Sequence, residues 1–227
     1  MERIDDLQYK GLKLIQDDAQ FCFGCDAVEL ANFADGGKKD RACDLGCGNG
    51  IIPVLLSVKK DMNVVGVEIQ KEVAALARRN VELNGLTQRI EIVNARMQDY
   101  AAERSNNGAF GVVTCNPPYR KRNSGLGREN SCIAVARQEI EVTLEEVADC
   151  AKRLLKSGGR FFTVGQTERL AETLTLCDAA RLKPKVLQIL RPTDKKPPHL
   201  FLLKCIKDGA DGMKVLPERA VKSYGME

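Results

Sequence analysis

Short apolar segments rich in β-branched residues alternate along this chain with amphipathic helical segments, and no other feature restricts the fold as much. The apolar segments lack the two-residue alternation of half-exposed strands, which is typical of strands buried on both faces. The expected strands cover residues 41–45, 64–68, 90–94, 111–115, 160–164, 186–190 and 200–206. Strands that alternate with helices in this way predict an α/β fold around a mostly parallel sheet with right-handed crossovers.

The spacing of apolar residues predicts two of the intervening helices in detail. In residues 71–84 the apolar side chains recur at intervals of three and four, which places them on one face. Residues 139–156 form a second apolar stripe, and Thr143 with Glu146 has the spacing of a capping box near its start. The glycine pair at 158–159 is expected to end this second helix.

The end of the chain breaks the alternation. Only residues 191–199 separate the last two expected strands, which is too short for a helical crossover and predicts a C-terminal antiparallel hairpin. The chain contains no internal repeat and no low-complexity tract. We therefore expect a single domain over residues 1–227, with an N-terminal segment at 1–40 and a basic hairpin and tail at 181–227.

The composition excludes several classes of function. The 227 residues are 44% hydrophobic and 29% charged with a net charge of +4, which suits one globular domain. A single histidine, His199, excludes a multi-histidine metal site and disfavours a histidine-based triad, and nine cysteines in a chain of this length favour a reducing compartment. No apolar run approaches the ~20 residues needed to span a bilayer, and the charged N-terminus lacks a signal-peptide core. We expect a cytoplasmic protein without a membrane partner.

A glycine-rich segment, DLGCGNG at 44–50, follows the first expected strand and opens a helix at Ile51. Alternate glycines allow a sharp turn and close approach to a ligand, and a helix N-terminus favours an anionic group. Glu68 ends the next strand, where an acid commonly accepts hydrogen bonds from ribose hydroxyls. The spacing matches neither the dinucleotide fingerprint nor a P-loop. A turn that binds nothing is the alternative, but the pattern favours the S-adenosylmethionine (SAM) loop of class I methyltransferases.

A second motif, Asn116-Pro117-Pro118-Tyr119, follows the fourth expected strand, and its two prolines fix a rigid turn. The arrangement suits a planar amide or ring-conjugated amine. The side-chain oxygen of Asn116 and the carbonyl of Pro117 can accept its two N–H bonds and direct its lone pair at a methyl donor. Tyr119 can stack on a planar acceptor, worth roughly 1–3 kcal/mol for a base. An ordinary Asn-Pro turn is the alternative, but the position after a SAM-type loop predicts four catalytic residues, Asn116, Pro117, Pro118 and Tyr119.

Together these motifs resemble methyltransferases with an Asn/Asp-Pro-Pro-Tyr signature, which modify planar exocyclic or amide nitrogens. Within that group the chain is most similar to the bacterial tRNA (adenine-N6)-methyltransferases that act beside the anticodon of a valine tRNA. The resemblance runs from about Ile4 to about Pro217 and includes residues 23–27, 136–139, 154–160 and 213–217. It implies a Rossmann-like, seven-stranded class I methyltransferase fold, SAM as cofactor, and methyl transfer to the exocyclic N6 amine of adenine in RNA, most closely tRNA.

The resemblance also implies roles for individual residues. The first strand end and the loop after it would hold the amino-acid portion of SAM, through Asp44, Gly46, Cys47 and Gly48. Glu68 would hold the ribose, and Ile69 would lie against the adenine ring. Phe23 and Asp26 would close the methionine side of the pocket, so that residues 1–40 act as a cofactor-closing segment. The complete expected cofactor-binding set is Phe23, Asp26, Asp44, Gly46, Cys47, Gly48, Asn49, Glu68, Ile69, Arg96 and Asn116.

The chain departs from the family pattern at several positions. Relatives usually carry an acidic residue at the position of Arg96, where it meets the adenine amine of SAM, and an arginine cannot accept that hydrogen bond. Backbone groups or Asp99 are candidate substitutes. Gly111 stands where Asp is common, Cys25 replaces a usual Thr, and residues 164–167 differ from the His-Arg-Pro type. These departures leave the Asn-Pro-Pro-Tyr motif intact.

Basic residues follow this motif directly and predict contacts with RNA. Arg120, Lys121, Arg122 and Arg128 are placed to hold phosphates while the target base is unstacked. Residues 181–227 contain 11 Lys or Arg and 5 Asp or Glu, a local charge of +6 that is also suited to RNA. The alternative for both groups is an ordinary solvated surface. We expect tRNA as the partner and no obligate protein partner.

Several alternatives remain open from the sequence. A protein-glutamine N5-methyltransferase uses the same acceptor loop, but such enzymes usually carry a helical domain before the SAM loop, and only 43 residues precede Asp44. A DNA adenine methyltransferase usually needs a separate target-recognition domain, for which the chain has no room. A SAM- or RNA-binding module without catalysis is favoured by Arg96. A four-thiol metal site is the competing account of four cysteines, Cys22, Cys25, Cys43 and Cys47, but two of them are expected to point in different directions, so we expect no metal.

Overall fold

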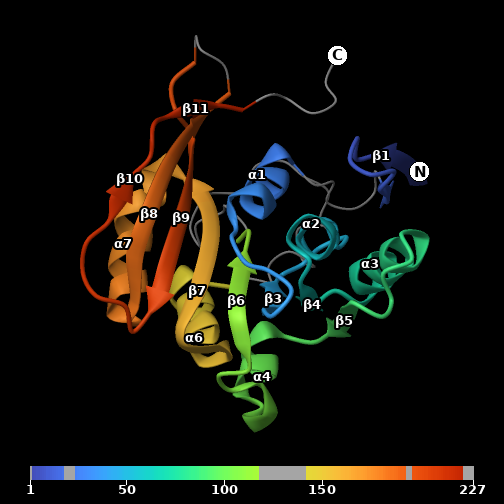
Figure 1. Cartoon of the computed structure of the whole chain (residues 1–227), viewed down its shortest axis with the longest axis horizontal. Coiled ribbons are helices and arrows are strands. Elements are labelled where there is room, and N and C mark those ends of the chain that lie inside the picture. Colours follow the sequence, from blue (N-terminus) through green and yellow to red (C-terminus); the bar gives the residue numbers. More distant parts are fainter. Residues whose placement is uncertain (1, 18–23, 118–141, 193–195, 222–227) are drawn as a thin grey trace, which may run out of the picture.

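The computed structural model describes residues 2–17, 24–117, 142–192 and 196–221. A nine-stranded sheet forms the centre of the chain, with helices on both of its faces (Figure 1). Its strands are β3 (Arg41–Leu45), β4 (Asn63–Glu68), β5 (Ile90–Asn94), β6 (Phe110–Cys115), β7 (Leu155–Gln166), β8 (Leu182–Arg191), β9 (Leu200–Lys207), β10 (Lys214–Val215) and β11 (Arg219–Ala220). The spatial order is β10-β8-β9-β7-β6-β3-β4-β5, and β11 also pairs with β8.

The directions of the strands confirm the predicted sheet. Neighbouring strands from β7 to β5 run parallel, whereas β9 is antiparallel to both β7 and β8. The expected strands at 41–45 and 90–94 have the observed bounds, and β8 with β9 forms the predicted C-terminal hairpin. The expected number of seven strands is wrong by two. The extra strands β10 and β11 are two residues long and cover the otherwise open edge of β8.

The helices divide between the two faces of the sheet. They are α1 (Cys25–Phe33), α2 (Ile51–Lys60), α3 (Lys71–Leu83), α4 (Met97–Ala102), α6 (Leu144–Leu154) and α7 (Leu170–Ala179), with short 3-10 turns η1 (Arg104–Asn106) and η2 (Thr167–Arg169). The first three contribute to one buried apolar cluster, and α4, α6 and α7 contribute to a second. Helices on both faces explain why β3, β4 and β6 are buried along nearly their whole length.

Helix α6 shows both a confirmed and a wrong prediction. The capping box is present, because the Thr143 hydroxyl accepts from the Glu146 backbone N–H and the Glu146 carboxylate accepts from the Thr143 backbone N–H. The glycine pair at 158–159 does not end the helix. Leu155 has already left the helix and pairs with Phe110 on β6, so the glycines lie inside β7.

An N-terminal hairpin that the sequence did not predict lies against α3. Its strands are β1 (Glu2–Asp6) and β2 (Lys13–Asp17). The Asn80 side chain on α3 accepts from the Ile15 backbone N–H at 2.6 Å and donates to the Ile15 carbonyl at 3.0 Å. It therefore satisfies the backbone groups of Ile15 on β2 in the way that a neighbouring strand would. Among the residues described, no helix has the length and apolar character needed to cross a membrane.

Candidate active site

Three parallel strands end side by side, and each end carries a polar residue from the predicted site. Strand β3 lies between β4 and β6, with Asp44 opposite Gly66 on one side and Thr114 on the other. Asp44 precedes the last residue of β3, Glu68 ends β4, and Asn116 directly follows β6. Because parallel strands present their carboxyl ends at one edge, this order brings the glycine-rich loop and the start of the Asn-Pro-Pro-Tyr motif to the same edge.

Asp44 is fully buried, and among the described residues only one of its oxygens has a hydrogen-bond partner. Its Oδ1 accepts a hydrogen bond from the Thr114 hydroxyl at 2.6 Å. Its Oδ2 is buried without a hydrogen-bond partner in the described part of the chain. Burial raises the pKa of this carboxyl to about 7, although the bond from Thr114 opposes the shift. A buried acceptor with an unused oxygen is suited to a ligand that brings a hydrogen-bond donor or a positive charge.

The loop after Asp44 needs glycine at three positions for the same backbone reason. Gly46, Gly48 and Gly50 all have positive φ values, at 71°, 55° and 87°, which side chains other than glycine rarely adopt. The backbone N–H groups of Gly46 and Cys47 both donate to the carbonyl of Val67 on β4, at 2.9 and 3.0 Å. These two hydrogen bonds therefore hold the loop against β4 without a contribution from a ligand.

Glu68 fixes the same loop through its side chain. Its Oε2 accepts from the Gly48 backbone N–H at 3.0 Å, and its Oε1 accepts from the Gln70 backbone N–H at 2.9 Å. Burial raises the pKa of this carboxyl, and the two backbone bonds oppose that shift. Each carboxylate oxygen has a second lone pair, so Glu68 retains the capacity to accept from a ribose hydroxyl while it holds the loop.

Asn49 supplies a second unsatisfied polar group in the loop. Its side chain is buried, and Nδ2 has no hydrogen-bond partner among the described residues. Its carbonyl accepts from Asn80 Nδ2 at 2.9 Å, so Asn80 joins the loop to β2. Asn80 was not among the predicted site residues, although a buried asparagine among the apolar positions of α3 was the available signal.

The unpaired atoms of Asp44 and Asn49 provide a test of whether the site fits SAM. Asp44 Oδ2 is an acceptor and Asn49 Nδ2 is a donor, and both are buried in one seven-residue segment. The amino-acid end of SAM carries an ammonium group and a carboxylate, which need an acceptor and a donor respectively. The donor and acceptor types of the loop therefore fit this end of SAM.

Asn116 is held by a residue that was expected to have another role. Its Nδ2 donates to Asp26 Oδ2 at 3.0 Å across 90 residues of sequence, and Asp26 Oδ1 accepts from the Ala27 backbone N–H at 2.9 Å. Because a carboxylate only accepts, Asp26 sets which end of the Asn116 carboxamide faces it, and the side-chain oxygen points away. The sequence placed Asp26 at the methionine side of SAM and did not predict this pair.

The remaining expected cofactor residues lie on neighbouring segments. Ile69 directly follows β4 and is partly exposed, and its carbonyl accepts from Asn94 Nδ2 at 2.9 Å. Arg96 is exposed and precedes the first residue of α4, and Asp99 lies exposed in the first turn of that helix. Both Arg96 and its candidate substitute Asp99 thus follow the carboxyl end of β5, the strand next to Glu68.

Part of the predicted site lies outside the described residues. This applies to Phe23, Pro118, Tyr119, Arg120, Lys121, Arg122 and Arg128. Of the four thiols considered for a metal site, Cys22 lies there as well. Cys43 and Cys47 belong to the two different apolar clusters, on opposite faces of the sheet, which disfavours that site.

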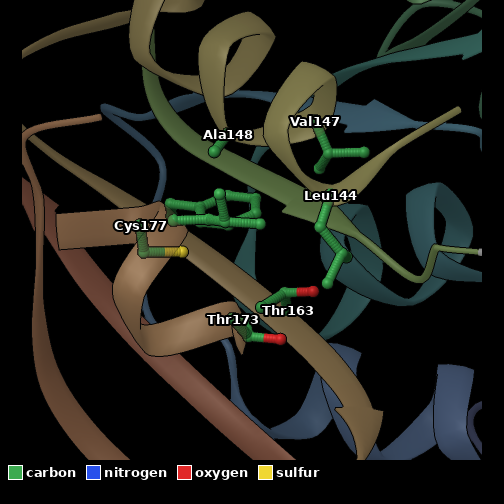
Figure 2. Close-up of a pocket in the computed structure, with 8 residues that line it drawn as sticks. Leu144, Val147, Ala148, Thr163, Thr173 and Cys177 are labelled. Carbon is green, nitrogen blue, oxygen red and sulfur yellow. The ribbon is translucent and has the colours of Figure 1, made fainter. Parts of the chain in front are cut away.

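A small hollow lies between α6, α7 and β7 (Figure 2). Figure 2 shows its mixed lining of apolar side chains, such as Leu144 and Val147, and the two hydroxyls of Thr163 and Thr173. An adjoining hollow shares Leu144, Thr163 and Thr173 and extends to Pro117. The surface next to Pro117 therefore combines apolar walls with hydroxyl groups.

The strand order, the glycine-rich loop and the position of Asn116 define a class I methyltransferase fold. The family model for the methyltransferase small domain matches residues 27–181, which is more than half of the chain. The chain belongs to this family, and the predicted methyltransferase class is confirmed.

Curated relatives carry a more specific name. A protein of Dyadobacter fermentans is 27% identical over 178 residues, covering 76% of this chain and 71% of the relative. A protein of Bacteroides fragilis is 24% identical over 222 residues, covering 97% and 92%. Both are named tRNA1(Val) (adenine(37)-N6)-methyltransferase.

Solved structures confirm the fold. A predicted O-methyltransferase from Agrobacterium tumefaciens has a TM-score of 0.67 at 22% identity, covering 86% of this chain and 85% of the other. Geranyl diphosphate C-methyltransferase from Streptomyces coelicolor, solved with S-adenosyl-L-homocysteine, has a TM-score of 0.60 at 16% identity, covering 80% and 76%. At these identities the similarity concerns the fold.

Proposed function

We propose that this chain is a SAM-dependent methyltransferase that modifies the exocyclic N6 amine of adenine in tRNA. The observation that carries the proposal is the shared strand edge. It places the unpaired oxygen of buried Asp44 and the oriented carboxamide of Asn116 at neighbouring strand ends. The names of the relatives from Dyadobacter and Bacteroides support adenine 37 of a valine tRNA as the acceptor. A tRNA acceptor also supports a cytoplasmic location.

The residues in and beside the glycine-rich loop have distinct proposed roles in SAM binding. Asp44 accepts from the ammonium group, and Asn49 donates to the carboxylate, which satisfies both buried atoms. Glu68 accepts from the ribose hydroxyls through the lone pairs that its two backbone bonds leave available. Ile69 packs against the adenine ring. The bound SAM supplies an electrophilic methyl group on a sulfonium centre.

The acceptor amine is oriented by Asn116 and Pro117. The lone pair of an adenine N6 amine is delocalised into the ring, so the nitrogen is a poor nucleophile. When Asn116 Oδ1 and the Pro117 carbonyl each accept one N–H bond, the lone pair is directed out of the ring plane toward the methyl group. Asp26 keeps the Asn116 oxygen turned toward the amine. No histidine base is required for this orientation.

The RNA contacts remain predictions from the sequence. Pro118 completes the rigid turn, and Tyr119 stacks on the target base. The nearby basic residues, Arg120, Lys121, Arg122 and Arg128, hold phosphates on either side of it.

Transfer of a tritiated methyl group from SAM to tRNA tests this proposal. The acceptor is bulk tRNA from cells that lack the protein, and the product nucleoside is identified by mass spectrometry. We expect N6-methyladenosine with the wild-type chain and none with Asn116→Ala. Asn63→Ala, which removes an exposed asparagine at the start of β4 and at the opposite edge of the sheet, is the matched control and is expected to retain activity. Label in a purified release factor instead of tRNA would identify a protein-glutamine methyltransferase and contradict the proposal.

A further inference from the structure

The orientation of Asn116 depends on the position of helix α1. Asp26, in the first turn of α1, accepts from the Asn116 side chain and is also bonded to the Ala27 backbone within its own turn. The carboxylate therefore has little freedom to move independently of the helix. A displacement of α1 would move Asp26 and rotate or release the Asn116 carboxamide.

A residue near the C-terminus holds α1 in place. Glu29 lies one turn after Asp26, and its side chain is only 4% exposed. Both of its oxygens face the guanidinium of Arg219, 190 residues further along the chain, with Nη1 at 3.3 Å from Oε1 and Nη2 bonded to Oε2. A fork-to-fork pair of this kind restricts direction as well as distance. The buried Glu29 carboxylate on α1 is thus neutralised by Arg219 of β11.

Strand β11 gives Arg219 a fixed backbone. Arg219 is in register with Leu190 of β8, and the backbone N–H of buried Val221 donates to the Arg191 carbonyl at 2.8 Å. The two-residue strand is therefore held by the sheet on one side and by the ion pair with Glu29 on the other. These contacts hold the two-residue strand against the edge of β8.

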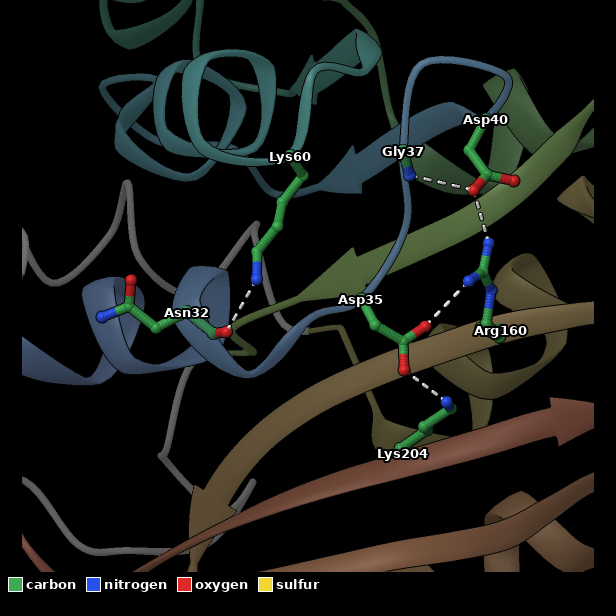
Figure 3. A network of polar contacts seen from close by, with 7 residues as sticks. All are labelled: Asn32, Asp35, Gly37, Asp40, Lys60, Arg160 and Lys204. Atoms are coloured by element: carbon green, nitrogen blue, oxygen red, sulfur yellow. Dashed lines mark hydrogen bonds and ion pairs between the residues drawn. The ribbon is translucent and has the colours of Figure 1, made fainter.

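The opposite end of α1 is anchored separately (Figure 3). Asp35, just after the helix, bonds to Arg160 of β7 at 2.8 Å and also pairs with Lys204 of β9. The Asn32 carbonyl accepts from Lys60 of α2 at 3.1 Å. These contacts fix the C-terminal end of α1 to the sheet, and the Glu29–Arg219 pair fixes the half of the helix that carries Asp26.

We propose that Arg219 is a positioning residue for the acceptor amine. By holding Glu29 it fixes α1, and through Asp26 it sets the orientation of the Asn116 carboxamide. The inference rests on the proposed function, in which Asn116 Oδ1 accepts from the amine. It gives the C-terminal strand a role in the transfer step in addition to covering the edge of β8.

Steady-state kinetics with tRNA and SAM separate this role from a structural one. Arg219→Ala is expected to lower kcat roughly 10- to 100-fold, as small misplacements of orienting groups do, with an unchanged KM for SAM. Arg219→Lys keeps the charge without the fork and is expected to recover part of the loss. Arg89→Ala is the matched control, since Arg89 pairs with the exposed Asp61 near the starts of β4 and β5, and it is expected to retain the wild-type kcat. A wild-type kcat for Arg219→Ala would overturn the proposal.

A second measurement does not depend on activity. In the protein without cofactor or tRNA, the side-chain amide protons of Asn116 are followed by NMR hydrogen exchange. We expect faster exchange in Arg219→Ala than in wild type or Arg89→Ala, with unchanged exchange for the backbone amides of β6. If wild type methylates no tRNA, the proposed function fails, and this measurement still decides whether Arg219 positions Asn116. Unchanged exchange of the Asn116 amide overturns the inference.

Discussion

Asp44 and Glu68 lie at the carboxyl ends of adjacent parallel strands, yet the protein uses them differently. Both Glu68 oxygens accept from backbone N–H groups, those of Gly48 and Gln70. Asp44 has one oxygen bonded to Thr114 and one buried oxygen with no partner in the described chain. The Glu68 carboxylate stabilises the loop. The Asp44 carboxylate has an oxygen whose hydrogen-bonding capacity the described part of the fold does not use.

This difference distinguishes two residues that the sequence analysis placed in one cofactor-binding set. A buried acceptor without a partner costs folding free energy, so its presence at a strand end indicates that another molecule satisfies it. Glu68 requires no such explanation, because its backbone bonds already account for its burial. Loss of Asp44 should therefore affect ligand binding most, and loss of Glu68 should affect both the loop and the ligand to a smaller degree.

The largest expected effect is that of Asp44→Asn on SAM binding. The substitution keeps the shape and the bond from Thr114 but turns a donor toward the ligand ammonium. Truncating one partner of a buried charged pair costs roughly 2–5 kcal/mol, so we expect the Kd for SAM to rise by about 100-fold or more. Isothermal titration calorimetry measures it, with Glu91→Gln, an exposed carboxylate on β5, as control. An Asp44→Asn variant with wild-type affinity would show that Asp44 is not a ligand contact.

Asp26 extends the comparison to a third carboxylate, which like Glu68 has bonds to both oxygens. In Asp26→Asn one side-chain oxygen is left for the Ala27 backbone N–H and the Asn116 amide. If that oxygen stays with Ala27, the new amide group faces Asn116 and favours an Asn116 carboxamide turned by 180°. We expect kcat to fall roughly 100-fold, a typical loss when one orienting group is removed, with little change in the Kd for SAM. If instead SAM binding weakens and kcat is preserved, Asp26 contacts the cofactor as the sequence predicted.

The unpaired oxygen of Asp44 also predicts how stability depends on pH. Its folded-state pKa of about 7 lies above the ordinary value, so the folded protein binds a proton that the unfolded chain releases. This group therefore favours folding at low pH and loses on the order of 2 kcal/mol of stability between pH 5 and 7. Urea unfolding of wild type and Asp44→Asn across this range isolates the contribution. A wild-type curve that keeps the same offset from Asp44→Asn at every pH contradicts it.

The smallest expected effect is that of Glu68→Gln. Glutamine has one acceptor oxygen, so either Gly48 or Gln70 loses its side-chain partner, at a cost of about 1 kcal/mol in unfolding free energy. Because the ribose loses one of several contacts, we expect the Kd for SAM to rise about tenfold. Thermal unfolding and calorimetry measure the two effects on one preparation. A loss of affinity larger than that of Asp44→Asn would reverse the comparison.

Much of the fold was predictable because it depends on local pattern. Strands β3 and β5 and helix α3 follow from apolar spacing within 15 residues, and the capping box of α6 follows from two residues three positions apart. The two-residue strands β10 and β11 carry no such pattern. They exist because the edge of β8 is available, which only the assembled sheet reveals.

The sequence could place candidate site residues together only where they are contiguous in the chain. The loop at 44–50 and Asn116 were identified from motifs, and the structure brings them to one edge of the sheet. The pairs Asp26–Asn116 and Glu29–Arg219 join residues 90 and 190 positions apart, so their partners depend on topology. Burial without a partner, as at Asp44, is likewise a property of three-dimensional packing.

Calorimetric titration of the purified chain with SAM tests most directly whether this strand edge is a cofactor site. We predict saturable binding at one site per chain, competition by S-adenosylhomocysteine, and a strong loss of affinity in Asp44→Asn but not in Asn116→Ala. Absence of binding at millimolar SAM would contradict the account, whatever the activity of the preparation.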